Sequence, residues 1–135
     1  MKEADIQREF MKTYVPFGAY ELKLTKHDSI PYNAVKEHQI AGLRKAKTPD
    51  GLFYKINDMP AFAGSMTRFS NPKPFDCFRM RAEKAYVAIC FYIPRQKKEL
   101  LCIDVDEFVF ARDNDKRKSL TKEKAYEISD IIITL

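Results

Sequence analysis

The chain has 135 residues, a length that fits a single domain, residues 1–135, with a core of its own. Its 45% hydrophobic and 32% charged residues are ordinary for a soluble globular protein, and no apolar run of about 18 residues exists to form a transmembrane helix. The net charge of +5 favours a polyanionic partner.

The first half of the sequence alternates between helix and strand signals. Residues 2–14 carry apolar side chains at helical spacing, and residues 19–25 read as a strand. Residues 33–47 predict a second helix with Asn33 as its N-cap, and residues 52–56 predict a short strand.

The second half predicts mainly strands, closed by a helix. Residues 57–74 show neither period, and a loop of this length in a compact domain is usually functional or disordered. The remaining elements are strands at 75–80, 86–92 and 100–105, a solvated charged loop at 112–118 and a helix at 121–135 with Thr121 as its N-cap. Asp104 and Asp106 are interpreted as strand-end or capping residues. The apolar run at 86–92 indicates a central strand buried on both faces, so the sequence predicts an α+β fold with a mixed sheet flanked by helices.

The three cysteines, Cys77, Cys90 and Cys102, lie in apolar, strand-like segments without any C-x-x-C spacing. We interpret them as reduced core residues of a cytoplasmic protein. Because the stretch from Met1 to Phe10 is charged and polar, we expect no secretory signal.

Glu21 and Lys23 share one face of the strand at 19–25, whereas Leu22 points to the other face. A carboxylate can hold a hard divalent cation, and an ammonium can stabilise the charge that develops on a phosphate. The pair therefore suits metal-assisted phosphodiester cleavage. The alternative is a solvated ion pair, which the same spacing produces on an exposed strand face.

Glu3 lies on the apolar stripe of the first helix, with Ile6, Phe10 and Tyr14. If Glu3 faces the sheet, its carboxylate needs a cation as partner. If the helix frays at this end, Glu3 lies in solvent and interacts favourably with the helix dipole.

Two further polar residues fall where apolar ones are expected. Gln39 lies on the stripe of the second helix, four residues after Val35, and is either a satisfied structural amide or a group that positions water or phosphate. His38 points off this stripe and is expected to be a surface or phosphate contact. Asp76 stands among aromatic residues on a strand expected to be buried, where a carboxylate requires a counter-charge or a metal.

Several stretches of the sequence together resemble a known family. They are Glu21-Leu22-Lys23-x-Thr25, Ser29-Ile30-Pro31, Val35-Lys36-Glu37-His38-Gln39-Ile40, residues 51–58, Lys73-Pro74-Phe75-Asp76 and the opening Glu3-x-x-Ile6-Gln7. This set is similar to the PD-(D/E)xK nuclease superfamily and, within it, to the Holliday junction resolvases of the RecU, compact archaeal and phage types. The order of motifs departs from the family, in which the aspartate strand precedes the E-x-K strand, whereas Asp76 follows it here.

The resemblance implies a restriction-endonuclease-like core and a metal-dependent endodeoxyribonuclease that resolves four-way DNA junctions. It implies Mg²⁺ or Mn²⁺ held by Asp76 and Glu21, with the Leu22 carbonyl and Glu3 assisting. Lys23 would offset the developing charge, and Gln39 would orient the water or a phosphate oxygen.

DNA backbone contacts are expected from Arg68, Lys73, Arg79, Arg81 and His38. Paired cuts in a four-way junction imply a homodimer, with an interface at the strand 86–92 or at the closing helix.

Two other functions remain open at this point. One is a different nuclease with the same core, acting on other branched or duplex DNA. The other is a non-catalytic nucleic-acid-binding module, which would bind DNA with a steep salt dependence and show no metal-dependent cleavage.

Overall fold

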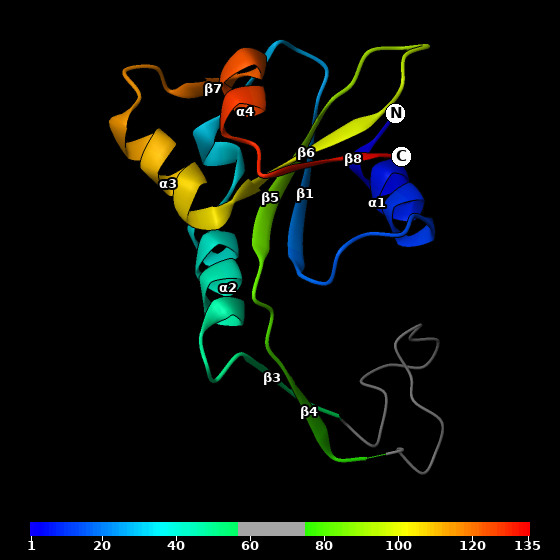
Figure 1. The fold of residues 1–135 in the computed structure, drawn as a ribbon, viewed down its shortest axis with the longest axis vertical. Coiled ribbons are helices and arrows are strands. Elements are labelled where there is room, and N and C mark those ends of the chain that lie inside the picture. The colour runs from blue at the N-terminus through cyan, green and yellow to red at the C-terminus, as the bar shows by residue number, and fades with distance from the viewer. Residues whose placement is uncertain (57–74) are drawn as a thin grey trace, which may run out of the picture.

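The computed structural model describes residues 1–56 and 75–135. Its elements follow in the order α1 (Glu3–Lys12), β1 (Ala19–Thr25), β2 (Ser29–Pro31), η1 (a 3₁₀ turn, Tyr32–Ala34), α2 (Glu37–Lys47), β3 (Leu52–Lys55), β4 (Cys77–Met80), β5 (Ala85–Phe91), β6 (Glu99–Asp104), α3 (Val105–Asn114), β7 (Ser119–Thr121), α4 (Lys122–Ile128) and β8 (Ile131–Thr134). The central sheet lies between helices on both faces, which confirms the predicted α+β class (Figure 1).

A four-stranded mixed sheet forms the centre of the molecule, in the order β1-β5-β6-β8. β1 and β5 run parallel, and α2 lies in the connection between them, as a parallel pair requires a long crossover. β6 runs antiparallel to both β5 and β8. The segment Ala85–Cys90 of β5 is buried throughout because this strand has a neighbour on each edge and a core on each face, as the sequence predicts.

The sheet separates two hydrophobic cores. Val87 and Ile89 of β5 face the core that α2, α3 and α4 cover, whereas Ala88 and Cys90 face the core under α1. Ile6 of α1 is fully buried in this second core. The sides of the sheet are thus distinct, and the side on which a β1 residue lies decides which helix it meets.

The first helix is shorter than predicted. It ends at Lys12, and Thr13 already has extended backbone angles ahead of Pro16. Phe10 packs on the Tyr20 ring with centroids 5.0 Å apart, but Tyr14 lies beyond the helix and is 96% exposed. The predicted stripe therefore ends before its last member.

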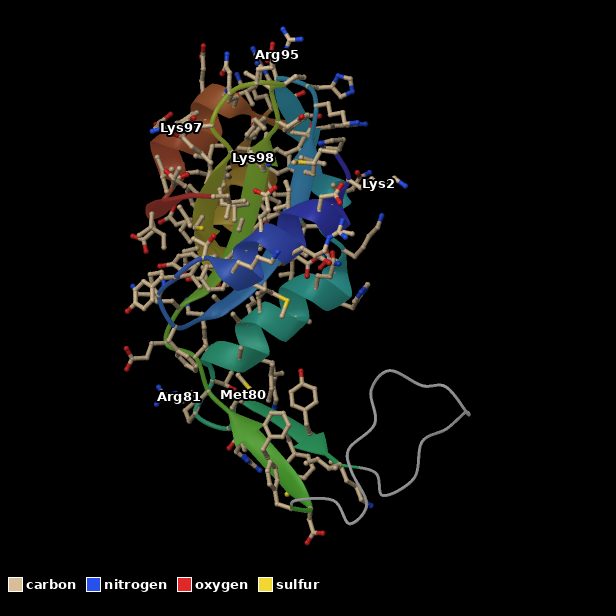
Figure 2. All side chains as sticks on the ribbon, turned by 90° about the vertical axis from the view of Figure 1, so that its right-hand side faces the viewer. Lys2, Met80, Arg81, Arg95, Lys97 and Lys98 are labelled. Atoms are coloured by element: carbon tan, nitrogen blue, oxygen red, sulfur yellow. The ribbon has the colours of Figure 1, made fainter. Side chains whose placement is uncertain are left out.

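β3 and β4 form a two-stranded hairpin that projects beyond the end of α2 (Figures 1 and 2). The expectation of a buried strand at 75–80 is wrong, because the hairpin pairs outside the central sheet and all of β4 is exposed. Cys77 is consequently exposed, whereas Cys90 and Cys102 are core residues as expected. Gly51 precedes β3 with φ +63°, and a Cβ there would lie 2.0 Å from the Met80 carbonyl oxygen, so the turn requires glycine.

The expected helix at 121–135 is wrong in its second half. α4 ends at Ile128, and Ile131–Thr134 pairs with β6 as the edge strand β8. Three isoleucines and a threonine are β-branched and favour a strand wherever a sheet edge can accept one. The predicted N-cap is confirmed, since the Thr121 hydroxyl accepts a hydrogen bond from the Lys124 amide at 3.2 Å.

The sequence pattern does not reveal α3. The start of the charged run at 112–118, expected as loop, belongs to the last turn of this helix. Asp104 caps it by accepting a 3.0 Å hydrogen bond from the Asp106 amide, which confirms the capping role expected for Asp104.

β5 has neither a free edge nor an exposed face that a second subunit could contact. The expectation that the strand 86–92 supplies a dimer interface is therefore wrong, and the homodimer itself stays a prediction. Among the residues that the structure describes, no helix has the length and apolar character needed to cross a membrane.

Candidate functional site

Glu21 and Lys23 lie on the face of β1 that points toward α2. Their register partners on β5 are Val87 and Ile89, which belong to the core beneath that helix. β1 is an edge strand of the sheet, so this face meets solvent as well as the core. The alternation of β1 thus holds two charged side chains at the rim of the core while Leu22 is buried on the other side.

Lys23 and Glu21 form an ion pair, with 3.2 Å between the ammonium nitrogen and Oε1. The side chains are 13% and 26% exposed, so this is not the solvated pair that the alternative interpretation describes. Partial burial strengthens the attraction relative to water but also requires each charge to keep its partner.

Gln39 completes the cluster from the first turn of α2. Its Nε2 donates a 2.8 Å hydrogen bond to Glu21 Oε1. Its Oε1 accepts a 2.9 Å hydrogen bond from the Lys36 amide, while the Gln39 amide donates to the Lys36 carbonyl at 3.0 Å. This reciprocal capping pattern fixes which end of the side-chain amide faces the sheet, because only the oxygen can accept from Lys36.

The second helix begins later than predicted, but Gln39 lies on the face that was expected. α2 begins at Glu37 with Lys36 as its N-cap, so the N-cap predicted at Asn33 is wrong, and Asn33 lies in η1. Gln39 does face the sheet, and both ends of its amide have partners. It is therefore a satisfied structural amide that holds Glu21 in place, and its role in orienting water or phosphate stays a prediction.

The carboxylate of Glu21 retains one oxygen for a ligand. Both contacts are made to Oε1, and within the described part of the chain Oε2 takes no hydrogen bond or ion pair. About a quarter of the Glu21 side chain is exposed, so part of it can be reached from solvent at the sheet edge.

A complete metal site is not assembled by the described residues. No group of three or more His, Cys, Asp or Glu side chains gathers among residues 1–56 and 75–135. Mg²⁺ is usually held by one or two carboxylates together with substrate phosphates and water. Glu21 supplies one carboxylate, and the Lys23 ammonium beside it disfavours a cation, so the described residues alone do not fit the ion and we derive no step through it.

The other predicted acids lie elsewhere. Asp76 is exposed at the outer end of the β3–β4 hairpin, where its carbonyl accepts a 2.8 Å hydrogen bond from the Ile56 amide. The argument that burial demands a metal at Asp76 therefore fails, and the hairpin that carries it projects beyond α2, away from β1 (Figure 1). Glu3 stands in the first turn of α1, across the sheet from Glu21; the helix does not fray there and the side chain is half-buried, although a carboxylate in the first turn does favour the helix dipole. The roles of Asp76 and Glu3 stay predictions.

The predicted DNA contacts are scattered. His38 is exposed on α2 next to Gln39. Arg79 donates to the Asp50 carbonyl at 3.1 Å and lies over the Phe53 ring, and Arg81 extends into solvent at the base of the hairpin (Figure 2). Arg68 and Lys73 fall outside the described residues.

A basic cleft beside the N-terminus of α2 is a feature that the sequence does not predict. It has a volume of ≈ 500 Å³, and its lining includes Lys36 and the successive residues Lys116, Arg117 and Lys118. The available signal is the charged run at 112–118, which by itself indicates only a solvated loop. That this run lies against the helix bearing Gln39 follows from tertiary structure, because β7, which comes after it, pairs with β2 just before η1.

Comparison with protein-family models, with curated proteins and with solved structures found no match to this chain.

Proposed function

We propose that this protein is a metal-dependent endodeoxyribonuclease that resolves four-way DNA junctions. The observation that supports this most is the convergence of Glu21, Lys23 and Gln39, three residues of the motif resemblance, on one carboxylate oxygen at an accessible sheet edge. Eighteen positions separate Glu21 from Gln39 in sequence, and only the fold brings them together.

Each side chain has a distinct task in this proposal. Lys23 presents an ammonium to the phosphate and offsets the negative charge that develops on it. Glu21 provides the carboxylate with a free Oε2, and Gln39 keeps that carboxylate aimed by holding its other oxygen. The resemblance implies Mg²⁺ as the cofactor and Asp76 as a further ligand, but Asp76 lies on the β3–β4 hairpin and not beside Glu21, so no step is assigned to the ion.

Further parts of the proposal follow from the resemblance. The parallel pair β1–β5 with α2 in its crossover would be the centre of a restriction-endonuclease-like core. A homodimer with a two-fold axis would make the paired cuts. A cytoplasmic location is consistent with three cysteines that form no disulfide.

A second candidate is a non-catalytic nucleic-acid-binding module. The observation that favours it is that the described residues form no group of three or more His, Cys, Asp or Glu side chains that could hold a metal ion. A protein of this kind would keep the fold and the basic surface but lack hydrolysis. A nuclease with the same core acting on linear or other branched DNA is the third.

The test is cleavage of a labelled four-way junction with Mg²⁺ or EDTA, beside linear duplex of the same arms. Glu21→Gln keeps the shape of the side chain and is expected to slow junction cleavage by roughly 10²–10³-fold. The matched control is Glu9→Gln, which removes another carboxylate that pairs with a lysine, Lys98, on the α1 side of the sheet. This control should cleave like the wild type.

Each result separates the candidates. Symmetric nicks at the junction that require Mg²⁺ and Glu21 support the resolvase. Equal cutting of linear duplex leaves a nuclease and removes the resolvase. Junction binding without cleavage under any metal condition favours the binding module.

A further inference from the structure

The cleft beside α2, which we call the α2–β7 cleft, is lined by more basic than acidic side chains. Its volume is ≈ 500 Å³, and its charged lining comprises Lys36, Glu37, Arg112, Asp115, Lys116, Arg117 and Lys118. A second cleft of ≈ 590 Å³ between α3 and α4 shares Asp115, Lys116 and Arg117 with it, so this basic segment borders both.

Both acidic residues of the α2–β7 cleft already have partners in the protein. Glu37 pairs with Arg112 at 2.7 Å. Asp115 accepts hydrogen bonds from the Arg117 amide at 2.9 Å and from the Tyr32 hydroxyl at 2.7 Å, and these hold the pKa of its carboxyl below the ordinary value. Asp115 nevertheless keeps its negative charge and attracts Arg117, so the five cations and two carboxylates of the lining leave a formal surplus of three positive charges.

Lys36, Lys116, Arg117 and Lys118 are all exposed, and none of them forms an ion pair within the part of the chain that the structure describes. The surplus of positive charge on this concave surface raises the local concentration of polyanions. Three of the four cations are consecutive residues, and all four line the same cleft. This arrangement fits an extended row of phosphates better than a single small anion.

The cleft is adjacent to the candidate site. Lys36 lines the cleft, and its amide donates to the Gln39 side chain, whose other end bonds Glu21. One glutamine side chain thus separates the edge of the cleft from the carboxylate. A DNA strand bound in the cleft would therefore pass close to the sheet edge where Glu21 and Lys23 lie.

Resting on the function proposed above, we propose that the α2–β7 cleft binds the sugar–phosphate backbone of one duplex arm of the DNA and directs it to Glu21. Lys36, Lys116, Arg117 and Lys118 contact successive phosphates and give affinity without sequence information. This surface differs from the hairpin that carries Arg79 and Arg81.

The experiment measures binding in EDTA, so that cleavage plays no part in it. Fluorescence anisotropy of a labelled four-way junction, and of duplex arms with two unrelated sequences, is recorded from 50 to 300 mM salt. The test variant is Lys116→Ala/Arg117→Ala/Lys118→Ala. The control is Lys2→Ala/Lys12→Ala/Lys97→Ala, which removes three exposed lysines from the two ends of α1 and from the β5–β6 loop. Figure 2 labels two of them, Lys2 and Lys97.

The test variant should bind at least about tenfold more weakly at 100 mM salt, and its slope of log K against log salt should become shallower by up to about 2.7, or about 0.9 for each phosphate that is no longer neutralised. Lys36→Ala, which keeps the backbone cap of α2, should reduce the slope by about 0.9. The control variant should bind like the wild type. The weakening should be the same for both duplex sequences.

The proposal is overturned if the test variant binds with wild-type affinity and slope, or if the control variant is weakened as much. It is also overturned if the wild-type protein binds neither the four-way junction nor the duplexes. Both the cleft proposal and the nuclease proposal are supported if the test variant loses binding and the Glu21→Gln protein binds DNA but does not cut it. If the test variant alone loses binding and the wild-type protein never cleaves DNA, the cleft proposal is supported and the nuclease proposal fails.

Discussion

Replacing Gln39 by glutamate isolates the contact that holds Glu21 in place. The new side chain keeps the oxygen that accepts from the Lys36 amide, so the cap of α2 is retained. It exchanges the donor that lies 2.8 Å from Glu21 Oε1 for a second carboxylate. Gln39→Met is the matched control, because it removes both hydrogen bonds and adds no charge.

The size of the effect follows from distance and exposure. Two unit charges about 3 Å apart repel by roughly 1.5 kcal/mol in water and by about 6 kcal/mol at an effective dielectric constant of 20. Glu21 is 26% exposed and has Lys23 beside it, which screens part of this repulsion. With rotation of the side chains apart, we expect Gln39→Glu to cost about 2 kcal/mol at pH 8, similar to the loss of a cap and a hydrogen bond in Gln39→Met.

The two variants should differ in their response to pH. When the engineered pair of carboxylates takes up one proton, that proton bridges them, so the folded state binds a proton more readily than the unfolded chain. Stability from a group whose folded pKa is raised is present at low pH and is lost as pH rises through that pKa. The penalty of Gln39→Glu should therefore fall below about 1 kcal/mol at pH 5, while that of Gln39→Met stays constant.

Urea unfolding followed by circular dichroism at pH 5, 6.5 and 8 measures both penalties. A Gln39→Glu protein as stable as the wild type at pH 8 would show that Gln39 and Glu21 are not in contact. A penalty that is independent of pH would show that the two carboxylates do not interact.

Three other outcomes follow from the structure. Gly51→Ala should weaken the β3–β4 hairpin by about 1–3 kcal/mol, because the residue needs a positive φ and a Cβ would meet the Met80 carbonyl; hydrogen exchange of the hairpin amides measures this, and unchanged protection would contradict it. Tyr32→Phe should lower the urea midpoint of unfolding at pH 7 and lower it less at pH 3. The Tyr32 hydroxyl helps to depress the pKa of Asp115, and this contribution to stability is lost as pH falls. Equal effects at both pH values would refute the assignment. A thiol reagent should modify Cys77 rapidly in the folded protein and the two buried cysteines only on unfolding, since burial raises the pKa of one of them, Cys102, to about 12; mass spectrometry of the peptides would reveal any other order.

Local patterns decide much of the fold without any tertiary contact. The apolar run at 86–92 has one stable place, the middle of a sheet, and β5 lies there. The alternation at 19–25 places Glu21 and Lys23 on one face and Leu22 on the other, because strand geometry has period two whatever the surroundings. The capping oxygens of Asp104 and Thr121 are equally local signals.

The wrong predictions concern segments whose structure depends on a distant partner. Residues 131–134 continue the apolar spacing of the preceding helix and are predicted as helix, but the edge of β6 accepts these β-branched residues as a strand. The segment at 75–80 has the composition of a buried strand, yet it pairs only with β3 and stays exposed, so the burial argument for Asp76 fails. Neither pairing partner could be identified from the segment itself.

Local sequence sets the chemistry of the candidate site: a carboxylate and an ammonium on one strand face, and a glutamine at the start of a helix. Tertiary structure alone brings Gln39 to the Glu21 oxygen that Lys23 already contacts, places Glu3 and Asp76 elsewhere, and lays the basic segment 116–118 along the same helix end. The physical reason is range. Strand alternation and helix capping act over two to four residues, whereas the crossover between β1 and β5 and the pairing of β2 with β7 join segments tens of residues apart.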